Sequence, residues 1–266
     1  MREPDLAPHL GIRLLVQEIR AIDLQKDSII LFVKGLVKKD PRLRNFLANF
    51  VDHFYEDLDG YKVFLEKNRS RPVKINIGAG SSLNNARFLN IDFCYFPGVH
   101  LRADAFRLPF KENSVDAILS EQLIEHVANP RELAEEFYRV LKTDGEIYIT
   151  APFMYPYHEA PIDLHRWTLE GFRNLMAGFA PIKTGVLGGP TATLVEALHG
   201  WLSVLFSFNS DKLYQVVYLL LIPFVKPFKI LDLILLNRYK SAHRSAAMFY
   251  YYGKKGPSPE PKSIDT

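Results

Sequence analysis

Two glycines and an aspartate are the first residues of this sequence whose spacing suggests chemistry. Gly78 and Gly80 follow the short apolar run Lys74–Ile77, and Asp92 follows a second run, Phe88–Ile91. Glycines let a backbone turn tightly and lie against a ligand, and a carboxylate can accept hydrogen bonds from both hydroxyls of a ribose. The pattern predicts a cleft for a nucleotide-type cofactor, although two glycines after a strand are about as often a plain turn.

Polar residues follow the next two strand-like runs in the same way. Asp104 comes directly after Val99–Ala103, where its carboxylate could accept from an adenine amino group. Val115–Ser120 leads into three further polar residues, which are Glu121, Gln122 and His126. Because the carboxyl ends of parallel strands lie at one edge of an open sheet, we expect these groups to border a single crevice. His126 has a plain alternative as a packing residue at the start of a helix.

The densest polar and aromatic segment spans residues 151–168. His158 is a candidate base, since histidine can take a proton near neutral pH, and Asp163 is placed to orient it. His126 is the second candidate base. Three residues are expected to contact an acceptor, with arginine able to hold a carboxylate or phosphate bidentately; they are Tyr157, His165 and Arg166. The plain alternatives are a loop-bracing hydrogen bond for His158 with Asp163 and a salt bridge for Arg166.

The elements that must position these residues alternate along the chain. Strand-like runs, the fifth being Glu146–Thr150, alternate with helical or turn segments between residues 73 and 152, the best helix being Pro130–Leu141. Such alternation is typical of an α/β fold with a Rossmann-like, mostly parallel sheet and helices on both faces. Lys142–Gly145 is expected to be a turn with Gly145 in the left-handed region. Thr168 is expected to cap the helix that follows it.

Four regions are predicted. Residues 1–70 form a helical N-terminal appendage, because apolar residues recur there at spacings of three and four. Residues 71–190 form the cofactor-binding core, and residues 191–252 form an apolar helical C-terminal segment with a candidate final strand. Residues 253–266 are rich in glycine, proline and lysine, and we expect a disordered tail.

Composition narrows the classes of function. The 266 residues are 48% hydrophobic and 24% charged, and the net charge of +3 is too small to argue for a nucleic-acid partner. The single cysteine, Cys94, excludes an internal disulfide, fits a reducing compartment and is expected to be a small buried side chain. No export signal is evident, so a cytoplasmic location is expected. The sequence predicts no metal site.

The stretch from Leu194 to Lys240 is unusually apolar. Asp211 and the prolines at 223 and 227 interrupt it below the roughly 18 apolar residues that a membrane-spanning helix needs. Two interpretations remain open. Its helices cap the sheet, or the segment makes peripheral contact with the inner face of a membrane, with four basic residues directed at lipid phosphates; these are Lys226, Lys229, Arg238 and Lys240.

At this point the sequence resembles a known family. The resemblance covers about Val73 to Phe179, and it is to class I S-adenosylmethionine-dependent methyltransferases of the type 11 kind. The segments that carry it are Asn76-Ile-Gly-Ala-Gly80, Asp92, Asp104, Leu108-Pro-Phe110, Val115-Asp116, Glu125-His-Val127, Arg139-Val-Leu-Lys142 and Gly145. In addition, His158, Pro161, Asp163 and Arg166-Trp-Thr168 are similar to a stretch of type 11 methyltransferases linked to cell-surface glycan assembly.

The resemblance implies a role for each residue. S-adenosylmethionine would be the cofactor, with Gly78 and Gly80 at its methionine part and Asp92 at its ribose. The other expected contacts are Asp104 and Ala105 at the adenine and Glu121 or Gln122 near the sulfonium. Three features depart from the family: Asn76 replaces an acidic residue, the third small residue of the turn is Ser82 rather than glycine, and Asp92 comes only 14 residues after Gly78.

The function expected from this resemblance is O-methylation of a glycan, a lipid-linked sugar or a small hydroxylated metabolite. The alternative is a catalytically silent cofactor-binding module in a membrane-peripheral envelope-assembly complex, which Asn76 and the shortened first crossover would permit.

Overall fold

The computed structural model describes residues 29, 32–33, 54–80, 87–94, 96–158 and 162–256. The chain divides into two compact units. We call the larger one the sheet unit, made of Phe54–Tyr155, Leu164–Thr193 and Ile230–Thr266. We call the other the hairpin unit, made of Met1–His53, Pro156–Asp163 and Leu194–Lys229.

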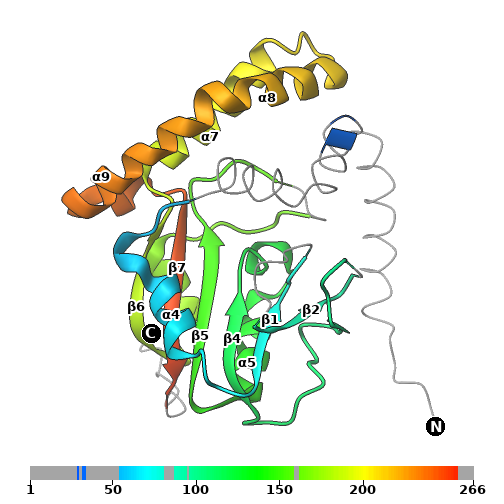
Figure 1. The fold of residues 1–266 in the computed structure, drawn as a ribbon, viewed down its shortest axis with the longest axis vertical. Helices are drawn as coiled ribbons and strands as arrows, with labels where there is room; N and C mark the ends of the chain where they lie inside the picture. Colours follow the sequence, from blue (N-terminus) through cyan, green and yellow to red (C-terminus); the bar gives the residue numbers. More distant parts are fainter. Residues whose placement is uncertain are drawn as a thin grey trace, which may run out of the picture. The chain divides into compact units, whose positions relative to one another are not determined.

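A single seven-stranded sheet is the centre of the sheet unit (Figure 1). Its strand order is β3-β2-β1-β4-β5-β7-β6. Strands β1 to β5 pair in parallel, and β7 pairs antiparallel with both β5 and β6. The expected Rossmann-like, mostly parallel α/β fold is therefore confirmed. The strands are β1 (Lys74–Ile77), β2 (Leu89–Asp92), β3 (Leu101–Arg102), β4 (Val115–Ser120), β5 (Leu141–Pro152), β6 (Phe179–Leu187) and β7 (Met248–Lys255).

The helices begin at residues that suit helix starts. Pro130 opens α5 after the Asn129 side chain accepts from the Glu132 N–H, and the Thr168 hydroxyl accepts from Gly171 N–H at 3.1 Å before α6, as predicted. The helical elements are η2 (Asp57–Asp59), α4 (Gly60–Lys67), η3 (Ile124–His126), α5 (Pro130–Val140), α6 (Leu169–Leu175), α7 (Pro190–Leu205), α8 (Asp211–Val225), η4 (Lys226–Leu231), α9 (Asp232–Arg238) and η5 (Lys240–Ser245).

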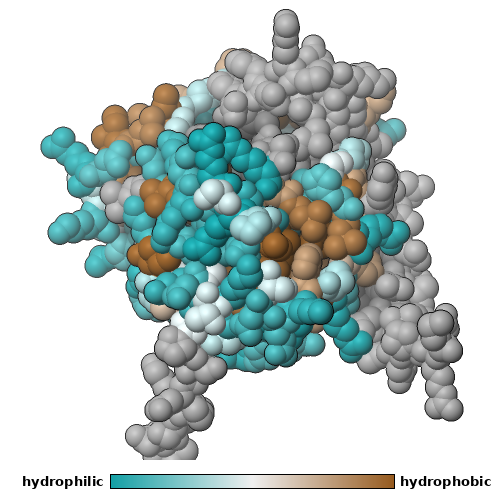
Figure 2. All heavy atoms as spheres, turned by 60° about the horizontal axis from the view of Figure 1, so that its bottom comes forward, coloured by the Kyte–Doolittle hydropathy of each residue, from teal (hydrophilic) through white to brown (hydrophobic). Residues whose placement is uncertain are grey.

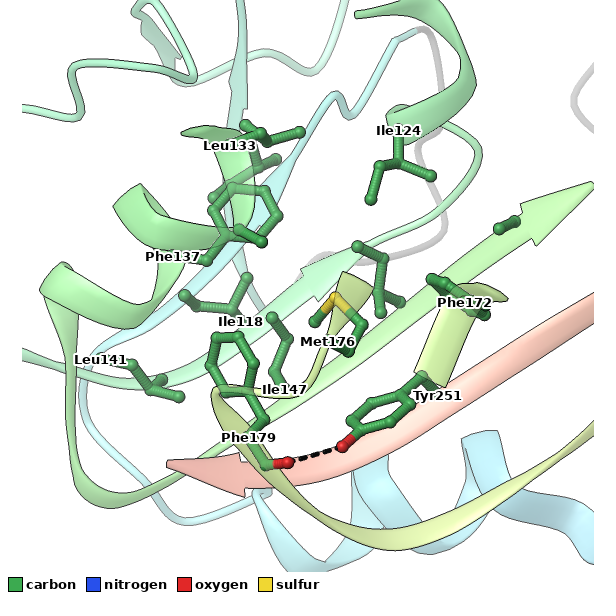
Figure 3. Packing of buried hydrophobic residues seen from close by; sticks show 14 of the residues in the cluster. Ile118, Ile124, Leu133, Phe137, Leu141, Ile147, Phe172, Met176, Phe179 and Tyr251 are labelled. Carbon is green, nitrogen blue, oxygen red and sulfur yellow. Dashed lines mark hydrogen bonds between the residues drawn. The ribbon is translucent and has the colours of Figure 1, made fainter. Parts of the chain in front are cut away.

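Alternation along the strands builds one core on each face of the sheet. On one face, Ile118 and Ile147 pack with Phe137 of α5 and Phe172 of α6 (Figure 3). The hydroxyl of Tyr251 in β7 donates to the Phe179 carbonyl at 2.7 Å, which satisfies the one polar atom of that side chain. Every residue of β4 is buried, as expected for a strand covered on both faces.

The opposite face is covered by α4. Phe64 of this helix is fully buried and packs with Phe88, Tyr148 and Tyr252. Tyr148 and Tyr252 directly follow Ile147 and Tyr251, which belong to the first core, as the period of two in a strand requires. Most of the predicted N-terminal appendage lies outside the described residues, but α4 belongs to the sheet unit and helps to close its core.

The end of the sheet at which the parallel strands begin comes forward in Figure 2. Hydrophilic side chains cover most of the face shown there, and hydrophobic side chains form separate patches among them. The sequence predicts a crevice at the other ends of these strands, where Gly78 and Glu121 follow β1 and β4 and Asp92 is the last residue of β2.

Three local predictions are wrong. Lys142–Gly145 does not form a turn before the strand. These residues lie within β5, which begins at Leu141 and pairs there with Val115. Asp144, with φ of 59°, takes the left-handed conformation assigned to Gly145. A Cβ on Gly145 would lie 2.8 Å from the Leu141 side chain, so close packing explains that glycine. The predicted tail boundary at Gly253 falls inside β7, which continues to Lys255.

In the hairpin unit, α7 and α8 are antiparallel helices that run side by side from Leu194 onward (Figure 1). The ring of His199 stacks on Tyr218 with centroids 4.0 Å apart. Lys226 and Lys229 are each 3% exposed and bind Glu196, so the prediction that these two lysines face lipid phosphates is wrong. None of the helices in the described part of the chain is long and apolar enough to cross a membrane.

Candidate functional site

The turn after β1 depends on two glycines in the left-handed region. Gly78 has φ of 71° and Gly80 has φ of 55°. The N–H groups of Gly78 and Ala79 both donate to the Ile91 carbonyl, at 3.0 and 3.2 Å, which ties the turn to β2. A Cβ on Gly78 would lie 3.0 Å from Leu123, whereas one on Gly80 would meet none of the described residues within 4 Å. Within the described part of the chain, Gly80 therefore has open space beside it at the carboxyl edge.

Asp92, the last residue of β2, is held against this turn. One carboxylate oxygen accepts from the Gly80 N–H at 2.9 Å, and the other accepts from the Cys94 N–H at 2.8 Å. A carboxylate oxygen has two lone pairs, so each can accept a further hydrogen bond. The structure thus brings Gly80 and Asp92 together, as the sequence predicted, with acceptor capacity left for a pair of ribose hydroxyls. Cys94 is half-buried beside them.

Asn76 has a partner inside the sheet. Its amide donates to the Asn90 side chain of β2 at 3.1 Å, and only 3% of Asn76 is exposed. Asn90 in turn donates to the Gly98 carbonyl at 3.0 Å. This chain of amides braces β1 against β2 and the loop beyond it. The contact of Asn76 with a cofactor remains a prediction.

The ends of β3 and β4 supply the remaining polar groups of this edge. Asp104 accepts from the Phe106 N–H at 3.0 Å, which fixes the turn that also holds the half-buried Ala105. After β4, Gln122 has φ of 51° and its N–H donates to the Thr150 hydroxyl at 3.0 Å, while Glu121 is half-buried. All of these residues belong to the sheet unit.

Two polar residues near the ends of β4 and β5 were not predicted from the sequence as site residues. Thr150 is 1% exposed and orients the backbone at Gln122, and Ser120 is fully buried. Among the described residues, the Ser120 hydroxyl has no hydrogen-bond partner. A signal was present, because each of them ends a run of apolar residues in an otherwise buried strand.

His126 ends the short helix η3 directly after β4. Its ring is mostly buried, and Nε2 lies 3.9 Å from a carboxylate oxygen of the fully buried Glu125. The plain alternative predicted a packing residue at the start of a helix; the ring is packed, but at the last residue of η3, six residues after the end of β4. Its role as a base remains a prediction.

His158 and Asp163 meet in the hairpin unit. One oxygen of Asp163 accepts from the His158 N–H at 2.9 Å and lies 3.3 Å from Nδ1 of the same residue. The Asp163 side chain is 1% exposed, so the pair is shielded on the carboxylate side. Tyr157 is 65% exposed beside it. This contact is the predicted loop-bracing hydrogen bond. It is also the contact by which Asp163 would orient His158 as a base, and that role remains a prediction.

Arg166 and His165 belong to the sheet unit. Arg166 donates to the carbonyls of Tyr155 at 3.2 Å and His165 at 2.8 Å, which braces the segment that leaves β5. The His165 ring lies 5.3 Å from the Trp167 ring. The structure gives Arg166 bonds to backbone carbonyls, and its predicted contact with an acceptor remains a prediction.

A shallow hollow of about 510 Å³ lies beside the end of β5, also within the sheet unit. Arg173, at its wall, binds Glu170 at 2.7 Å and the Thr184 hydroxyl. Sequence reasoning missed this hollow, since its walls come from segments far apart in the chain. The lining residues are Phe153, Thr168, Leu169, Glu170, Arg173, His243, Arg244 and Phe249.

Comparison with known families decides the class of the sheet unit. A family model described as a methyltransferase domain matches residues 78–149, from the glycine turn to β5. Residues 78–149 are therefore similar to a methyltransferase domain. The type 11 class predicted from the sequence is confirmed for this segment, and the link to glycan assembly stays a prediction. S-adenosylmethionine is the cofactor that this class of domain uses.

Curated relatives of the methyltransferase domain match over a short segment. An uncharacterized methyltransferase of Mycobacterium tuberculosis strain H37Rv is 41% identical over 54 residues, which cover 20% of this chain and 21% of that protein. One from Mycolicibacterium gilvum is 46% identical over 48 residues, 18% of this chain and 19% of the relative. The match thus spans about a fifth of the curated relatives' length.

Solved structures align over more of the chain at lower identity. The [4+2]-cyclase SpnF is 16% identical over 78% of this chain and 87% of its own, with a TM-score of 0.47. Phosphoethanolamine N-methyltransferase 2 of Haemonchus contortus, solved with S-adenosyl-L-methionine, is 16% identical over 75% of this chain and 53% of its own, with a TM-score of 0.42.

The residues of the methyltransferase domain fit the cofactor. The open space beside Gly80 lets a ligand approach the backbone, and the anchored Asp92 keeps lone pairs for two hydroxyls. Packing does not require glycine at position 80, because a Cβ there would meet none of the described residues within 4 Å; the φ of 55° is what favours glycine.

Proposed function

We propose that this chain is an S-adenosylmethionine-dependent methyltransferase that methylates a hydroxyl group of a glycan, a lipid-linked sugar or a related small molecule. The observation that carries the proposal is the Gly80–Asp92 arrangement inside the methyltransferase domain. A glycine turn with open space in front of it, fixed to a carboxylate at the end of the next strand, suits a ribose-containing cofactor.

Each cofactor-binding residue has a distinct task in this proposal. Asp92 accepts hydrogen bonds from the ribose hydroxyls, and the backbone at Gly78 and Gly80 borders the methionine part. Asp104 with Ala105 borders the adenine, and Glu121 or Gln122 lies toward the sulfonium. When bound, the cofactor supplies a methyl group that its sulfonium already activates. The protein then has to align the acceptor and exclude water.

A hydroxyl acceptor also has to lose its proton, and His158 is our candidate base. Because Asp163 lies 3.3 Å from Nδ1, its carboxylate favours the tautomer that carries the proton on Nδ1. Nε2 then keeps the lone pair that takes the proton from the acceptor. Asp163 is the positioning residue of this pair, and His126 is the second candidate base.

The acceptor class rests on the segment between β5 and α6. Its resemblance to methyltransferases linked to cell-surface glycan assembly supports a sugar acceptor. Arg166 is able to bind a carboxylate or phosphate, such as the phosphate of a lipid-linked sugar, and we assign Tyr157 and His165 to the same task.

The experiment that tests the function is transfer of a labelled methyl group from S-adenosylmethionine. Lipid-linked sugars, free glycans and small hydroxylated metabolites are offered separately to the full-length protein. Transfer to one class that is lost in Asp92→Ala supports the proposal. Binding of the cofactor without transfer to any of them would instead support a catalytically silent module.

A further inference from the structure

In the helices of the hairpin unit, apolar side chains are exposed and polar side chains are buried, which is the reverse of the usual arrangement for a protein in water. From Leu194 to Phe208, every exposed side chain is apolar and every strongly polar one is buried. The exposed residues recur at helical spacing and form one broad stripe; they are Leu194, Ala197, Leu198, Trp201, Val204, Leu205, Phe206 and Phe208. The buried polar residues are Glu196, His199, Ser203 and Ser207.

The second helix follows the same rule after its first two residues, Asp211 and Lys212, which are exposed. From Leu213 to Lys229, the strongly polar side chains are Gln215, Lys226 and Lys229, each no more than 3% exposed. Its exposed side chains are Leu213, Val216, Leu220, Pro223, Phe224 and Phe228. Several are strongly exposed, among them Leu220 at 63% and Phe224 at 73%.

Most of the buried polar groups have partners inside the hairpin unit, the exception among the described residues being Nδ1 of His199. Glu196 binds both Lys226 and Lys229, at 2.5 and 2.7 Å. His199 Nε2 lies 2.8 Å from the Tyr218 carbonyl, and the Ser203 hydroxyl donates to the His199 carbonyl at 2.8 Å. Buried charges are costly unless they are paired, so this pairing is what a helix pair needs when its surroundings offer no water.

These surroundings are better matched by lipid than by another protein. Protein interfaces carry a polar rim and about one hydrogen bond per 100–200 Å². The exposed polar side chains of the hairpin are confined to its turn, at residues 209–212, and the stripes at 194–208 and 213–228 have none. The helices, of 16 and 15 residues, are about 24 and 22 Å long, which is shorter than the roughly 30 Å hydrocarbon core of a bilayer. Insertion to a shallow depth therefore fits their length.

Charge on the next segment of the chain points to an anionic surface. Along residues 230–245 of the sheet unit, the exposed charges are all positive and accompany exposed apolar residues such as Ile234 and Tyr239. The single acidic residue there, Asp232, is 1% exposed and accepts from the N–H groups of Gly189, Thr191 and Ala192. The exposed basic residues are Arg238, Lys240 and Arg244.

We propose that the α7–α8 hairpin seats this protein on an anionic phospholipid membrane, with the exposed apolar stripes of both helices among the upper acyl chains. The buried Glu196–Lys226–Lys229 cluster and the His199–Tyr218 contact hold the helices together there. Arg238, Lys240 and Arg244 belong to the sheet unit and, taken by themselves, suit anionic headgroups. This attachment of the hairpin to a membrane requires no methyl acceptor, so it is independent of the proposed function.

Vesicle flotation of the full-length protein tests whether the hairpin binds a membrane. We expect the protein to float with vesicles of phosphatidylcholine mixed with phosphatidylglycerol, and less with phosphatidylcholine alone. Leu205→Glu on α7 and Phe224→Glu on α8 should each lower the partition coefficient roughly tenfold or more, because each places a charge among acyl chains. Ile182→Glu is the matched control, since Ile182 is an apolar residue of β6 that is 42% exposed, and it should float as the wild type does.

Tryptophan fluorescence is a second measurement, which tests whether α7 enters the upper acyl chains. The chain has two tryptophans, and Trp201 is 60% exposed on α7. In a Trp167→Phe background, emission of Trp201 should shift to shorter wavelength with the mixed vesicles and be quenched by brominated acyl chains. Far-ultraviolet circular dichroism and a thermal unfolding midpoint equal to those of the wild type would show that the flotation variants are folded.

Three results would overturn the proposal. The first is wild-type protein that stays at the bottom of the gradient with both kinds of vesicle. The second is flotation of Leu205→Glu and Phe224→Glu at the wild-type level. The third is a stable wild-type dimer that does not float and that the same two variants convert to monomers, since a second copy would then cover the stripes.

Discussion

The backbone N–H of Gly80 donates a 2.9 Å hydrogen bond to the carboxylate of Asp92. This bond joins the turn after β1 to the end of β2, so the backbone that would border the methionine part of a cofactor and the carboxylate that would bind its ribose keep a fixed separation. A preformed arrangement of this kind lowers the cost of ordering the site when a ligand binds.

Removal of the Asp92 carboxylate should weaken cofactor binding strongly. In Asp92→Ala we expect the Kd for S-adenosylhomocysteine to rise roughly 100-fold, because hydrogen bonds to a charged group contribute about 1.5–3 kcal/mol each. Isothermal titration calorimetry measures this change. Asp144→Asn is the control, since its side chain is 75% exposed and asparagine tolerates the left-handed backbone there. Wild-type affinity in Asp92→Ala would refute the ribose assignment.

The two glycines of the turn should respond differently to alanine. Gly78→Ala combines φ of 71° with a Cβ placed 3.0 Å from Leu123, so we expect a loss of about 2–3 kcal/mol in the free energy of unfolding. Gly80→Ala has open space, so it should cost only about 1 kcal/mol while its methyl group hinders the cofactor. Chemical denaturation and calorimetry separate the two effects. Equal losses of stability with unchanged binding by both variants would contradict the assignment of Gly80 to the cleft.

Parts of this arrangement were readable from the sequence. β1 and β4 have the predicted bounds, because a continuous apolar run between turn residues is the signature of a strand buried on both faces. The meeting of Gly80 with Asp92 followed from the rule that parallel strands end at one edge.

Other parts depend on partners that are distant in the sequence. β6 was not predicted, because it is an outer strand with a mixed burial pattern that becomes regular only through pairing with β7. Lys226 looked like a membrane-facing charge, but its partner Glu196 lies 30 residues earlier, on another helix. No local sequence pattern predicts a buried ion pair between residues this far apart in the chain.

Glu146 of β5 should make stability depend on acid pH. Burial raises the pKa of this carboxyl, but hydrogen bonds from Lys67, Tyr252 and Asn68 outweigh that effect and hold the pKa below its ordinary value of 4.5. The charged form is therefore favoured in the folded state, and its contribution is complete above the unfolded pKa and lost as the pH falls through the lower folded value.

Glu146→Gln removes this titrating group with little change in shape. At neutral pH we expect the free energy of unfolding to fall by about 2 kcal/mol, and below pH 4.5 the difference from wild type should shrink. Urea denaturation across this range measures both. Glu66→Gln is the control, because Glu66 is 68% exposed and its pair with Arg69 at 3.8 Å should contribute little. A difference that stays constant with pH would contradict this account of Glu146.

His158 should affect transfer and spare cofactor binding. If it is the base, His158→Ala lowers kcat roughly 100-fold with unchanged affinity for S-adenosylhomocysteine, and Asp163→Asn lowers kcat less. Added imidazole should restore part of the activity of His158→Ala, which a merely loop-bracing residue would not allow. Full activity in His158→Ala would leave His126 as the candidate.

The central claim is that the edge formed by β1, β2 and β4 binds S-adenosylmethionine. Calorimetric titration of the full-length protein with S-adenosylmethionine, and separately with S-adenosylhomocysteine, tests it most directly. We predict saturable micromolar binding of both at one site. Absence of binding to either would contradict the account and leave a methyltransferase fold without its cofactor function.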